Sequence, residues 1–278
     1  MNAASWMRTI AFTLAAAALL YGAVLGLLWF KQERLLFQPQ VLPPSHRFDT
    51  AADVHEVWVD VAGARLNALH LRLPQPRGVV FFLHGNAGSL DNWFVNLDFY
   101  RRAGLDLFML DYRGYGKSSG HITSEAQLHD DVRRVWRSVA PRYAGLPRVF
   151  FGRSLGTGPA AALAAQEAPE LTVLVSPYFS MQALAAEHYP WVPSRLLRYP
   201  LRTDQWLPRL RGAVLLVHGD QDHLVEPSHS LRLKALRPPS RLVLVPGAGH
   251  NDLQQFPAYS DALADALAAA LDSAPAPR

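Results

Sequence analysis

The sequence of 278 residues contains no cysteine, which excludes disulfide bonds, cysteine nucleophiles, zinc–thiolate sites and iron–sulfur clusters. Lysine is also scarce, since only three of the 27 lysine and arginine residues are lysines, and the basic residues are scattered along the chain. There is no phosphate-binding GxxxxGKS/T loop. With a net charge of only +4 and no basic cluster, the sequence does not indicate a nucleic-acid-binding protein.

A long uncharged stretch is present near the start of the chain. Residues 9–30, between Arg8 and Lys31, would span about 33 Å as a helix, enough to cross the bilayer's apolar core of about 30 Å. Trp6 and Trp29 lie where interfacial aromatic residues are expected. The alternative is a cleaved signal peptide, but its apolar region is shorter, about 7 to 15 residues, and ends in small residues. We therefore expect an uncleaved membrane anchor.

The sequence predicts three parts. Residues 1–34 form the anchor, residues 35–272 form one globular domain, and residues 273–278 form a disordered tail. Basic residues are nearly balanced on the two sides of the apolar span, so they bias its orientation only weakly. We expect a monomeric protein of the bacterial inner membrane, with its domain on the periplasmic side.

From residue 54 onward, short apolar runs alternate with segments of helical length. The runs at 54–61 and 64–73 meet at Gly63 and predict an antiparallel hairpin. Six further strands are expected at 78–85, 106–112, 148–152, 171–177, 213–219 and 241–247. Helices are expected between most of them, for example over 123–140, with Thr123 or Ser124 as a cap, and over 257–271. The pattern predicts an α/β fold with a mostly parallel eight-stranded sheet covered by helices on both faces.

One connection, residues 178–212, is longer than an ordinary crossover and predicts a short cap over the carboxyl edge of the sheet. Two acidic residues, Glu187 and Asp204, are outnumbered there by five arginines. These arginines, with Trp191 and Trp206, either face anionic lipid headgroups near the anchor or are solvated positions on the cap surface.

The segment Gly152-Arg153-Ser154-Leu155-Gly156 follows a predicted buried strand and precedes a predicted helix. It matches the G-x-S-x-G pattern of a nucleophile elbow, a tight turn that lifts a serine oxygen out of the sheet. Bulky side chains two residues before and after the serine would collide, which explains Gly152 and Gly156. We therefore expect Ser154 to be a nucleophile.

A serine nucleophile requires a base and a carboxylate that orients the base. Both follow later strands in the expected order: Asp222 after the strand at 213–219 and His250 after the strand at 241–247. Asp220 is the alternative acid, although it is closer to the strand end and better suited to shaping the turn. The predicted catalytic residues are Ser154, Asp222 and His250.

Acyl transfer also requires donors for the developing oxyanion. The loop after the strand at 78–85 is small and flexible, and we expect the backbone N–H groups of Asn86 and Leu155 to form the oxyanion hole. His84 is expected to support this loop rather than to take part in catalysis.

Several segments together resemble the α/β-hydrolase superfamily: HGNAGS, DYRGYGKSSG, GRSLGTGPA, HGDQDHLVEP and GAGHND. With the anchor and the segment HYPWVPSRLLRYP, they are similar to the membrane-anchored Bem46 and ABHD13/ABHD17-like branch, over almost the entire chain. The resemblance implies a serine hydrolase and, for some members, hydrolysis of esters or thioesters, including S-acyl groups on proteins. The cysteine cluster by which ABHD17-type members are palmitoylated is missing, so that mode of membrane targeting does not carry over.

We therefore expect a membrane-anchored serine hydrolase that cleaves carboxylic esters or thioesters through an acyl-enzyme, without a metal or organic cofactor. The expected partner is an ester or thioester substrate, for which the resemblance implies a lipidic or protein-attached acyl group, and no nucleic-acid partner is expected. A serine aminopeptidase-like peptidase is the alternative, and would need Glu187 or Asp204 to hold the substrate amine. A binding module without catalysis would have lost a member of the triad, and none is lost.

Overall fold

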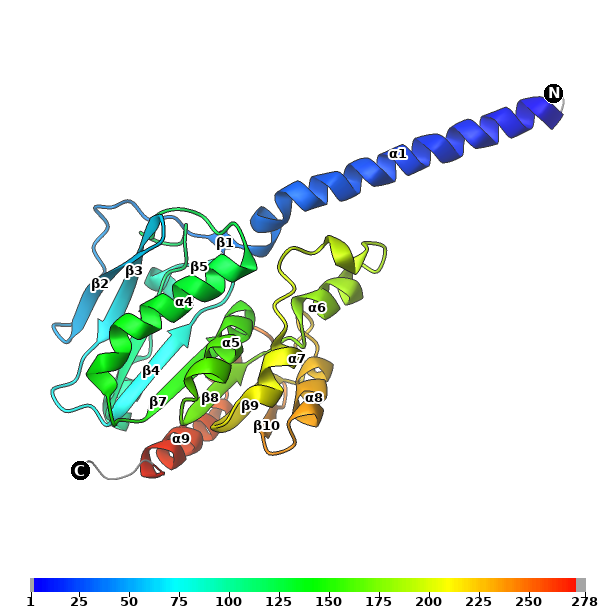
Figure 1. Ribbon diagram of the computed structural model, residues 1–278. Coiled ribbons are helices and arrows are strands. Elements are labelled where there is room, and N and C mark those ends of the chain that lie inside the picture. Colours follow the sequence, from blue (N-terminus) through cyan, green and yellow to red (C-terminus); the bar gives the residue numbers. More distant parts are fainter. Residues whose placement is uncertain (1–2, 274–278) are drawn as a thin grey trace.

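An eight-stranded sheet forms the centre of the computed structural model, which describes residues 3–273 (Figure 1). In chain order its strands are β2 (Val54–Val61), β3 (Ala64–Leu71), β4 (Gly78–Leu83), β6 (Leu105–Leu110), β7 (Arg148–Arg153), β8 (Leu171–Val175), β9 (Ala213–Gly219) and β10 (Arg241–Val245). Their spatial order is β10-β9-β8-β7-β4-β6-β3-β2. Only β3 runs in the direction opposite to the other seven strands, so the prediction of a mostly parallel sheet with an opening hairpin is confirmed.

Helices cover both faces of the sheet because neighbouring apolar residues on each strand point to opposite sides. Phe81 on β4 packs edge-on against Trp136 of α4 (Glu125–Val139), with ring centroids 5.3 Å apart. The next residue, Phe82, stacks on Phe151 of β7 on the opposite face, at 4.4 Å. Helices α4, α5 (Thr157–Glu167) and α8 (Pro227–Leu236) pack on the first face, and α3 (Leu97–Ala103) and α9 (Pro257–Asp272) on the second.

Local signals set the ends of these elements. Helix α4 begins after Ser124, whose Oγ accepts a hydrogen bond from the backbone N–H of Gln127 at 3.1 Å. The β2–β3 hairpin turns at Gly63, which has a left-handed backbone (φ 74°) that favours glycine. Of the tail predicted at 273–278, residues 274–278 lie outside the described residues.

Helix α1 (Ala3–Leu36) projects from the domain and lies apart from its core (Figure 1). Within it, the stretch Ala4–Leu36 contains an 18-residue window with a mean hydropathy of 2.1 and is long and apolar enough to cross a membrane. The helix continues two residues past the end predicted for the anchor segment. A short strand, β1 (Gln38–Pro39), follows directly and pairs with β5 (Ala87–Gly88).

The connection predicted as a cap holds four short helices between β8 and β9. They are α6 (Met181–His188), η3 (Ser194–Leu196), α7 (Thr203–Trp206) and η4 (Leu207–Arg209). Figure 1 shows this segment, in yellow-green and yellow, between the central sheet and the side from which α1 projects. The segment therefore lies between the ends of the parallel strands and the apolar helix.

Candidate active site

The carboxyl ends of β7, β9 and β10 bring Ser154, Asp222 and His250 together, although they are up to 96 residues apart in the chain. The Oγ of Ser154 lies 3.0 Å from Nε2 of His250. The Nδ1 of His250 lies 2.7 Å from Oδ2 of Asp222. Because a carboxylate accepts from Nδ1–H, Nε2 carries the lone pair that faces the serine hydroxyl. The three side chains form one continuous chain of hydrogen bonds.

Ser154 occupies a strained turn between β7 and α5. Its backbone φ is 49°, in the left-handed region that non-glycine residues rarely adopt. The turn leaves no room for side chains at Gly152 and Gly156: a Cβ on Gly152 would lie 2.6 Å from the carbonyl oxygen of Gly156. A Cβ on Gly156 would lie 2.1 Å from the carbonyl oxygen of Leu83. The two glycines therefore permit the close packing that holds the serine at the strand end.

The two candidate acids after β9 have different surroundings. Asp220 accepts a hydrogen bond from the backbone N–H of Gly247 at 2.7 Å and so ties together two turns. Asp222 is buried, and its second oxygen accepts from the backbone N–H groups of Leu224 and Val225. Burial alone would raise the pKa of the Asp222 carboxyl, but hydrogen bonds from His218, His250 and Val225 hold it well below its usual value. The structure thus places an ionised Asp222 against His250.

A second histidine lies against the same carboxylate. The Nε2 of His218 is 2.7 Å from the carbonyl oxygen of Val225 and 3.2 Å from Oδ2 of Asp222. Because both of these oxygens accept, Nε2 carries the proton, and Nδ1 accepts from the Ser230 hydroxyl at 2.6 Å. His218 is fully buried, and its Nε2 approaches Oδ2 of Asp222, the same oxygen that accepts from His250.

The predicted oxyanion residues lie on peptide units that are held through their carbonyl oxygens. His84 Nδ1 donates to the carbonyl of Gly85 at 2.7 Å, which fixes the Gly85–Asn86 peptide and hence the direction of the Asn86 N–H. The carbonyl of Asn86 accepts from the Tyr115 hydroxyl at 2.6 Å and from the backbone N–H of Gln38 at 2.9 Å. The loop after β4 is therefore held on both sides of Asn86.

The peptide between Ser154 and Leu155 is held in the same way. The hydroxyl of Thr157, which is fully buried, donates to the carbonyl oxygen of Ser154 at 2.7 Å. That contact sets the direction of the Leu155 N–H, because the C=O and N–H of one trans peptide point in opposite directions. The Tyr178 hydroxyl donates to the next carbonyl, that of Leu155, at 2.9 Å.

Arg153, immediately before Ser154, is a buried cation with no ion pair among residues 3–273. Its Nη2 donates to the backbone carbonyl of His250 at 2.8 Å, and its Nη1 lies 3.4 Å from the side-chain oxygen of Gln254. The guanidinium lies 6.0 Å from the ring centre of Trp93. Burial lowers the pKa of the Arg153 guanidinium from its ordinary value.

Sequence reasoning did not identify Arg153, Thr157 or His218 as parts of the site. Arg153 and Thr157 lie within three residues of Ser154, so inspection of the whole elbow could have suggested them. His218 lies four residues before Asp222 on an apolar strand, where a polar residue is itself a signal. In residues 3–273, no group of three or more histidine or acidic side chains is arranged to hold a metal ion.

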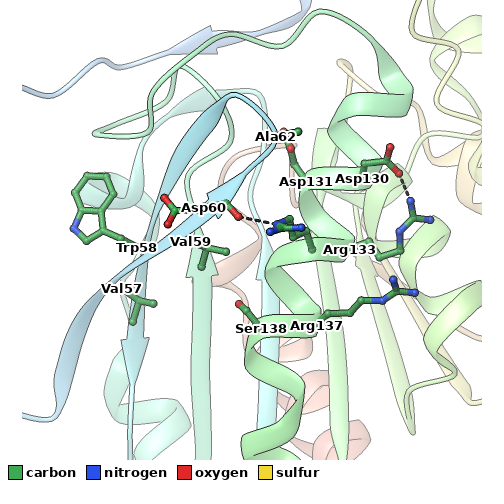
Figure 2. A pocket seen from close by; sticks show the side chains of 11 residues that line it. Val57, Trp58, Val59, Asp60, Ala62, Asp130, Asp131, Arg133, Arg137 and Ser138 are labelled. Atoms are coloured by element: carbon green, nitrogen blue, oxygen red, sulfur yellow. Dashed lines mark hydrogen bonds and ion pairs between the residues drawn. The ribbon is translucent and has the colours of Figure 1, made fainter.

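A hollow of about 840 Å³ lies elsewhere, between β2 and α4 (Figure 2). Four strand positions separate β2 from β7, which is about 19 Å at the usual spacing, so this hollow is distant from Ser154. Two of its arginines are already engaged by the protein. Arg133 pairs with Asp130, and Arg134 donates to the backbone carbonyl of Asp60 at 2.7 Å. It contains none of the predicted site residues.

Comparison with known proteins assigns this architecture to a class, the α/β hydrolases. A family model described as serine aminopeptidase, S33, matches residues 74–203, and one described as alpha/beta hydrolase fold matches residues 201–257. Human alpha/beta hydrolase domain-containing protein 17B (ABHD17B) is 30% identical over 208 residues, which cover 72% of this chain and 70% of that protein. The chain belongs to the α/β-hydrolase family, in its ABHD17-like group.

Other similar proteins agree with this assignment. An uncharacterized protein of Mycobacterium tuberculosis is 33% identical over 249 residues, which cover 86% of this chain and 87% of that protein. An esterase of Pyrococcus furiosus superposes with a TM-score of 0.66 at 18% identity, over 85% of this chain and 98% of its own. A soluble variant of the Saccharomyces cerevisiae monoglyceride lipase gives a TM-score of 0.62 at 17% identity, over 82% and 99%. At such identities the solved structures establish the fold alone.

Proposed function

We propose that the chain is a membrane-anchored serine hydrolase that cleaves carboxylic esters or thioesters through an acyl-enzyme. The observation that carries this proposal is the hydrogen-bond chain from Ser154 Oγ through His250 to Asp222, with distances of 3.0 and 2.7 Å. An alcohol aligned with an imidazole lone pair can lose its proton to that nitrogen as it attacks. The ionised Asp222 stabilises the imidazolium that forms.

In the first half-reaction, Ser154 Oγ attacks the acyl carbonyl carbon while its proton passes to His250 Nε2. The carbonyl π electrons move to oxygen, and the N–H groups of Asn86 and Leu155 stabilise the resulting oxyanion. The oxyanion then collapses and expels the alcohol or thiol, which takes the proton from His250. The contacts of His84 and Thr157 to the neighbouring carbonyls support this arrangement, because donors fixed before the reaction need no reorganisation.

In the second half-reaction, water replaces the leaving group. His250 Nε2 takes a proton from water as the water oxygen attacks the acyl-enzyme carbonyl, and the same oxyanion site is used again. Collapse releases the carboxylic acid, and Ser154 Oγ recovers its proton from His250. No step calls for a group beyond the triad, the two N–H donors and water.

The peptidase alternative is less well supported, even though one matching family model is described as a serine aminopeptidase. A substrate amine needs a free carboxylate, and both acidic candidates in the cap are paired. Glu187 lies 2.6 Å from His229 Nε2 and 3.3 Å from Arg232, and Asp204 lies 2.6 Å from Arg202. These pairs favour an uncharged acyl substrate over a cationic N-terminus.

The proposed anchor is helix α1, and we place the domain on the periplasmic side of a bacterial inner membrane. Fusions of the C-terminus to alkaline phosphatase and to green fluorescent protein distinguish the two sides. An active phosphatase fusion is expected on the proposed orientation, and a fluorescent green fluorescent protein fusion contradicts it.

Labelling with a fluorophosphonate probe tests the nucleophile. Wild type is expected to label, and Ser154→Ala is expected to lose both labelling and esterase activity. Ser176→Ala is a matched control, because Ser176 is also a buried serine with φ 49° at the end of the neighbouring strand β8. Labelling that persists in Ser154→Ala overturns the assignment.

The substrate class is tested with p-nitrophenyl esters of increasing chain length, an S-acyl peptide and an aminoacyl-naphthylamide. Turnover of esters or of the S-acyl peptide is expected. Preferred turnover of the aminoacyl-naphthylamide would favour the peptidase instead.

A further inference from the structure

The cap is attached along one side of the apolar helix α1. The Tyr21 hydroxyl donates to the backbone carbonyl of Trp191 at 2.8 Å, 170 residues away in the chain. Eleven residues further along α1, Gln32 Nε2 donates to the carbonyl of Leu196 at 2.7 Å, and its side-chain oxygen accepts from the N–H of Arg198 at 2.8 Å. Residues 191–198 therefore follow α1 over about 16 Å.

The same segment is fixed at the base of α1. The Arg198 guanidinium pairs with Glu33 at 2.7 Å and lies over the ring of Trp29, 5.6 Å from its centre. The Tyr199 hydroxyl donates to Glu33 at 2.9 Å, and the Tyr199 ring packs edge-on against Phe37. The position of the cap relative to α1 is thus set at both ends of the contact.

The length of exposed apolar helix determines where this contact lies relative to a membrane. Residues 9–23 are all exposed, whereas most of residues 24–29 are partly covered. Fifteen helical residues span about 22 Å, which is less than the apolar core of about 30 Å. Extension toward the N-terminus would draw Arg8 into hydrocarbon, so the span has to extend toward Phe30. Tyr21 then lies about 14 Å inside the end of the span, and Trp191 beside it.

The chemistry of the cap tip suits such a position. Tyr189 is 57% exposed and Trp191 is 50% exposed, so two aromatic rings are available for contact with acyl chains. Residues 188–203 contain no acidic side chain, and Arg195 makes no ion pair among the residues that the structure describes. Arg195 adjoins Leu196, which is bonded to Gln32 just beyond the end of the span, where anionic headgroups are expected.

A segment that enters lipid must satisfy its own backbone polar groups, because no water is available there. Several backbone groups of the tip have such partners. The carbonyls of Tyr189 and Trp191 accept from the N–H of Val192 and from the Tyr21 hydroxyl, and the N–H of Leu196 donates to the carbonyl of Pro193. The prolines at 190 and 193 have no N–H to satisfy.

We infer that residues 189–197 of the cap insert into the lipid leaflet beside α1, so that the enzyme takes long-chain acyl esters directly from the membrane. This inference rests on the proposed function, since it requires both the anchor and the esterase site. The other end of the cap reaches that site: the Tyr178 hydroxyl contacts the Leu155 carbonyl, and His188 Nε2 bonds the carbonyl of Leu224, two residues after Asp222. The cap therefore links the leaflet to the loops of the catalytic residues.

The absence of cysteine makes a direct depth measurement possible. Single-cysteine variants of the full chain are labelled with the fluorophore NBD and placed in phosphatidylcholine–phosphatidylglycerol vesicles with or without doxyl-labelled lipid. Tyr189→Cys reports on the tip, Leu14→Cys on the exposed middle of the anchor, and Leu236→Cys on an exposed apolar position at the far end of α8. The labels at 189 and 14 are expected to show blue-shifted emission that doxyl lipid quenches, and the label at 236 is expected to behave as in water.

Each other outcome has a distinct meaning. If doxyl lipid quenches the label at position 14 while the label at position 189 behaves as in water, insertion of the cap is overturned but the proposed anchor is supported. Water-like labels at both positions overturn the anchor and the insertion together. A label at 189 that is shielded but not quenched by doxyl lipid indicates a protein contact, such as a second copy of the chain, and also overturns the insertion.

Activity gives an independent test. The double variant Tyr189→Ser/Trp191→Ser is expected to hydrolyse a long-chain ester embedded in vesicles about tenfold more slowly than wild type, because the apolar tip no longer enters the leaflet. Its rate on soluble p-nitrophenyl acetate is expected to be unchanged, and Leu236→Ser is the matched control for both substrates. If the double variant and wild type hydrolyse the embedded ester at equal rates, and both hydrolyse the soluble ester, the inference is overturned. If wild type itself hydrolyses neither substrate, the proposed function is overturned.

Discussion

Arg153 and His250 are joined by a hydrogen bond from the guanidinium Nη2 to the backbone carbonyl, 2.8 Å long. The residue before the proposed nucleophile thus holds the loop of the proposed base. This contact connects the ends of β7 and β10, two strands that are separated in the sheet by β8 and β9. It explains how a loop that begins at β10, three strand positions from β7, can keep an imidazole within 3.0 Å of Ser154.

Replacement of Arg153 by methionine tests this positioning. Arg153→Met keeps much of the side-chain volume but removes the donor, and kcat for a soluble ester is expected to fall about 10- to 100-fold with little change in KM. Stability is expected to be retained, because a desolvated cation without an ion pair is replaced by an apolar group. Steady-state kinetics and thermal unfolding measure the two effects, and an unchanged kcat contradicts the positioning role.

Thr157 provides a second positioning test, directed at the proposed oxyanion donor. Thr157→Val is nearly isosteric and keeps the bond from its backbone N–H to the Ser154 carbonyl, but it loses the hydroxyl bond to that carbonyl, so the Leu155 N–H is held less firmly. The expected result is about a tenfold fall in kcat. Thr157→Ser restores the hydroxyl and is expected to recover most of the activity. Equal kinetics for the valine and serine variants would exclude the hydroxyl as the cause.

The left-handed backbone of Ser154 predicts a trade between stability and activity. Ser154→Gly relieves the strain at φ 49°, whereas Ser154→Ala retains it. Both variants are expected to be inactive, but the glycine variant is expected to be more stable than the alanine variant by about 1 kcal/mol. Chemical unfolding of the two variants under identical conditions measures the difference. An alanine variant at least as stable as the glycine variant contradicts strain at this position.

Most of the sheet and the outline of the site follow from local patterns. Buried parallel strands are continuous apolar runs, so the eight strands are visible in the sequence, although their ends are not. The run at 64–73 ends as a strand at Leu71, because the next backbone groups turn to other partners: the N–H of Leu73 bonds Asp106 at 2.8 Å. The order of Ser154, Asp222 and His250 is set by the chain, but their meeting depends on strand order in space, which no local pattern encodes.

The features that could not be predicted depend on contacts between distant segments. Strands β1 and β5 have two residues each, too few to show an alternation. The contact between Tyr21 and Trp191 joins positions 170 residues apart, and both residue types are common at membrane interfaces without such a contact. Side-chain direction, rather than residue type, gives these positions their roles.

Acid sensitivity is predicted from a half-buried histidine on α4, His129, whose ring nitrogen Nε2 is buried. His129 Nε2 has no hydrogen-bond partner among the described residues, and burial lowers the pKa of His129 to about 4, with opposing effects from Asp130 and Arg133. The unfolded chain binds this proton near pH 6.5, whereas the folded chain binds it only near pH 4. The free energy of unfolding therefore does not depend on His129 above pH 6.5, and it decreases as the pH falls toward 4. The loss from this group is about 2 kcal/mol at pH 5.

Replacement of His129 by phenylalanine removes the group that titrates. His129→Phe is expected to leave stability at pH 7 nearly unchanged, because the new ring can keep the edge-on contact with Trp206. The difference in unfolding midpoint between pH 7 and pH 5 is expected to shrink. Two other buried histidines, His70 and His229, also have a lowered pKa, so part of the pH dependence remains. An unchanged difference would show that His129 is already free to ionise in the folded protein.

The contacts of the segment after α1 predict that the proposed anchor can be removed without loss of soluble-ester turnover, whereas residues 38–42 cannot. The N–H of Gln38 donates to the Asn86 carbonyl, and Gln40 exchanges further backbone hydrogen bonds with Gly88 and Gly116. A truncated chain that begins at Lys31 keeps these contacts together with those of Gln32 to the cap. It is expected to hydrolyse a soluble short-chain ester at close to the wild-type rate.

A matched chain that begins at Pro43 lacks β1, so the Asn86 carbonyl loses the bond from the Gln38 N–H and keeps the bond from the Tyr115 hydroxyl. Its kcat is expected to fall at least about tenfold, because the oxyanion donor is held less firmly. Circular dichroism of the two truncated proteins separates this effect from general unfolding, since β1 contributes only two residues to the sheet structure. Equal activity of the two proteins would mean that the loop after β4 keeps its conformation without β1, with the Tyr115 hydroxyl and His84 sufficient to hold it.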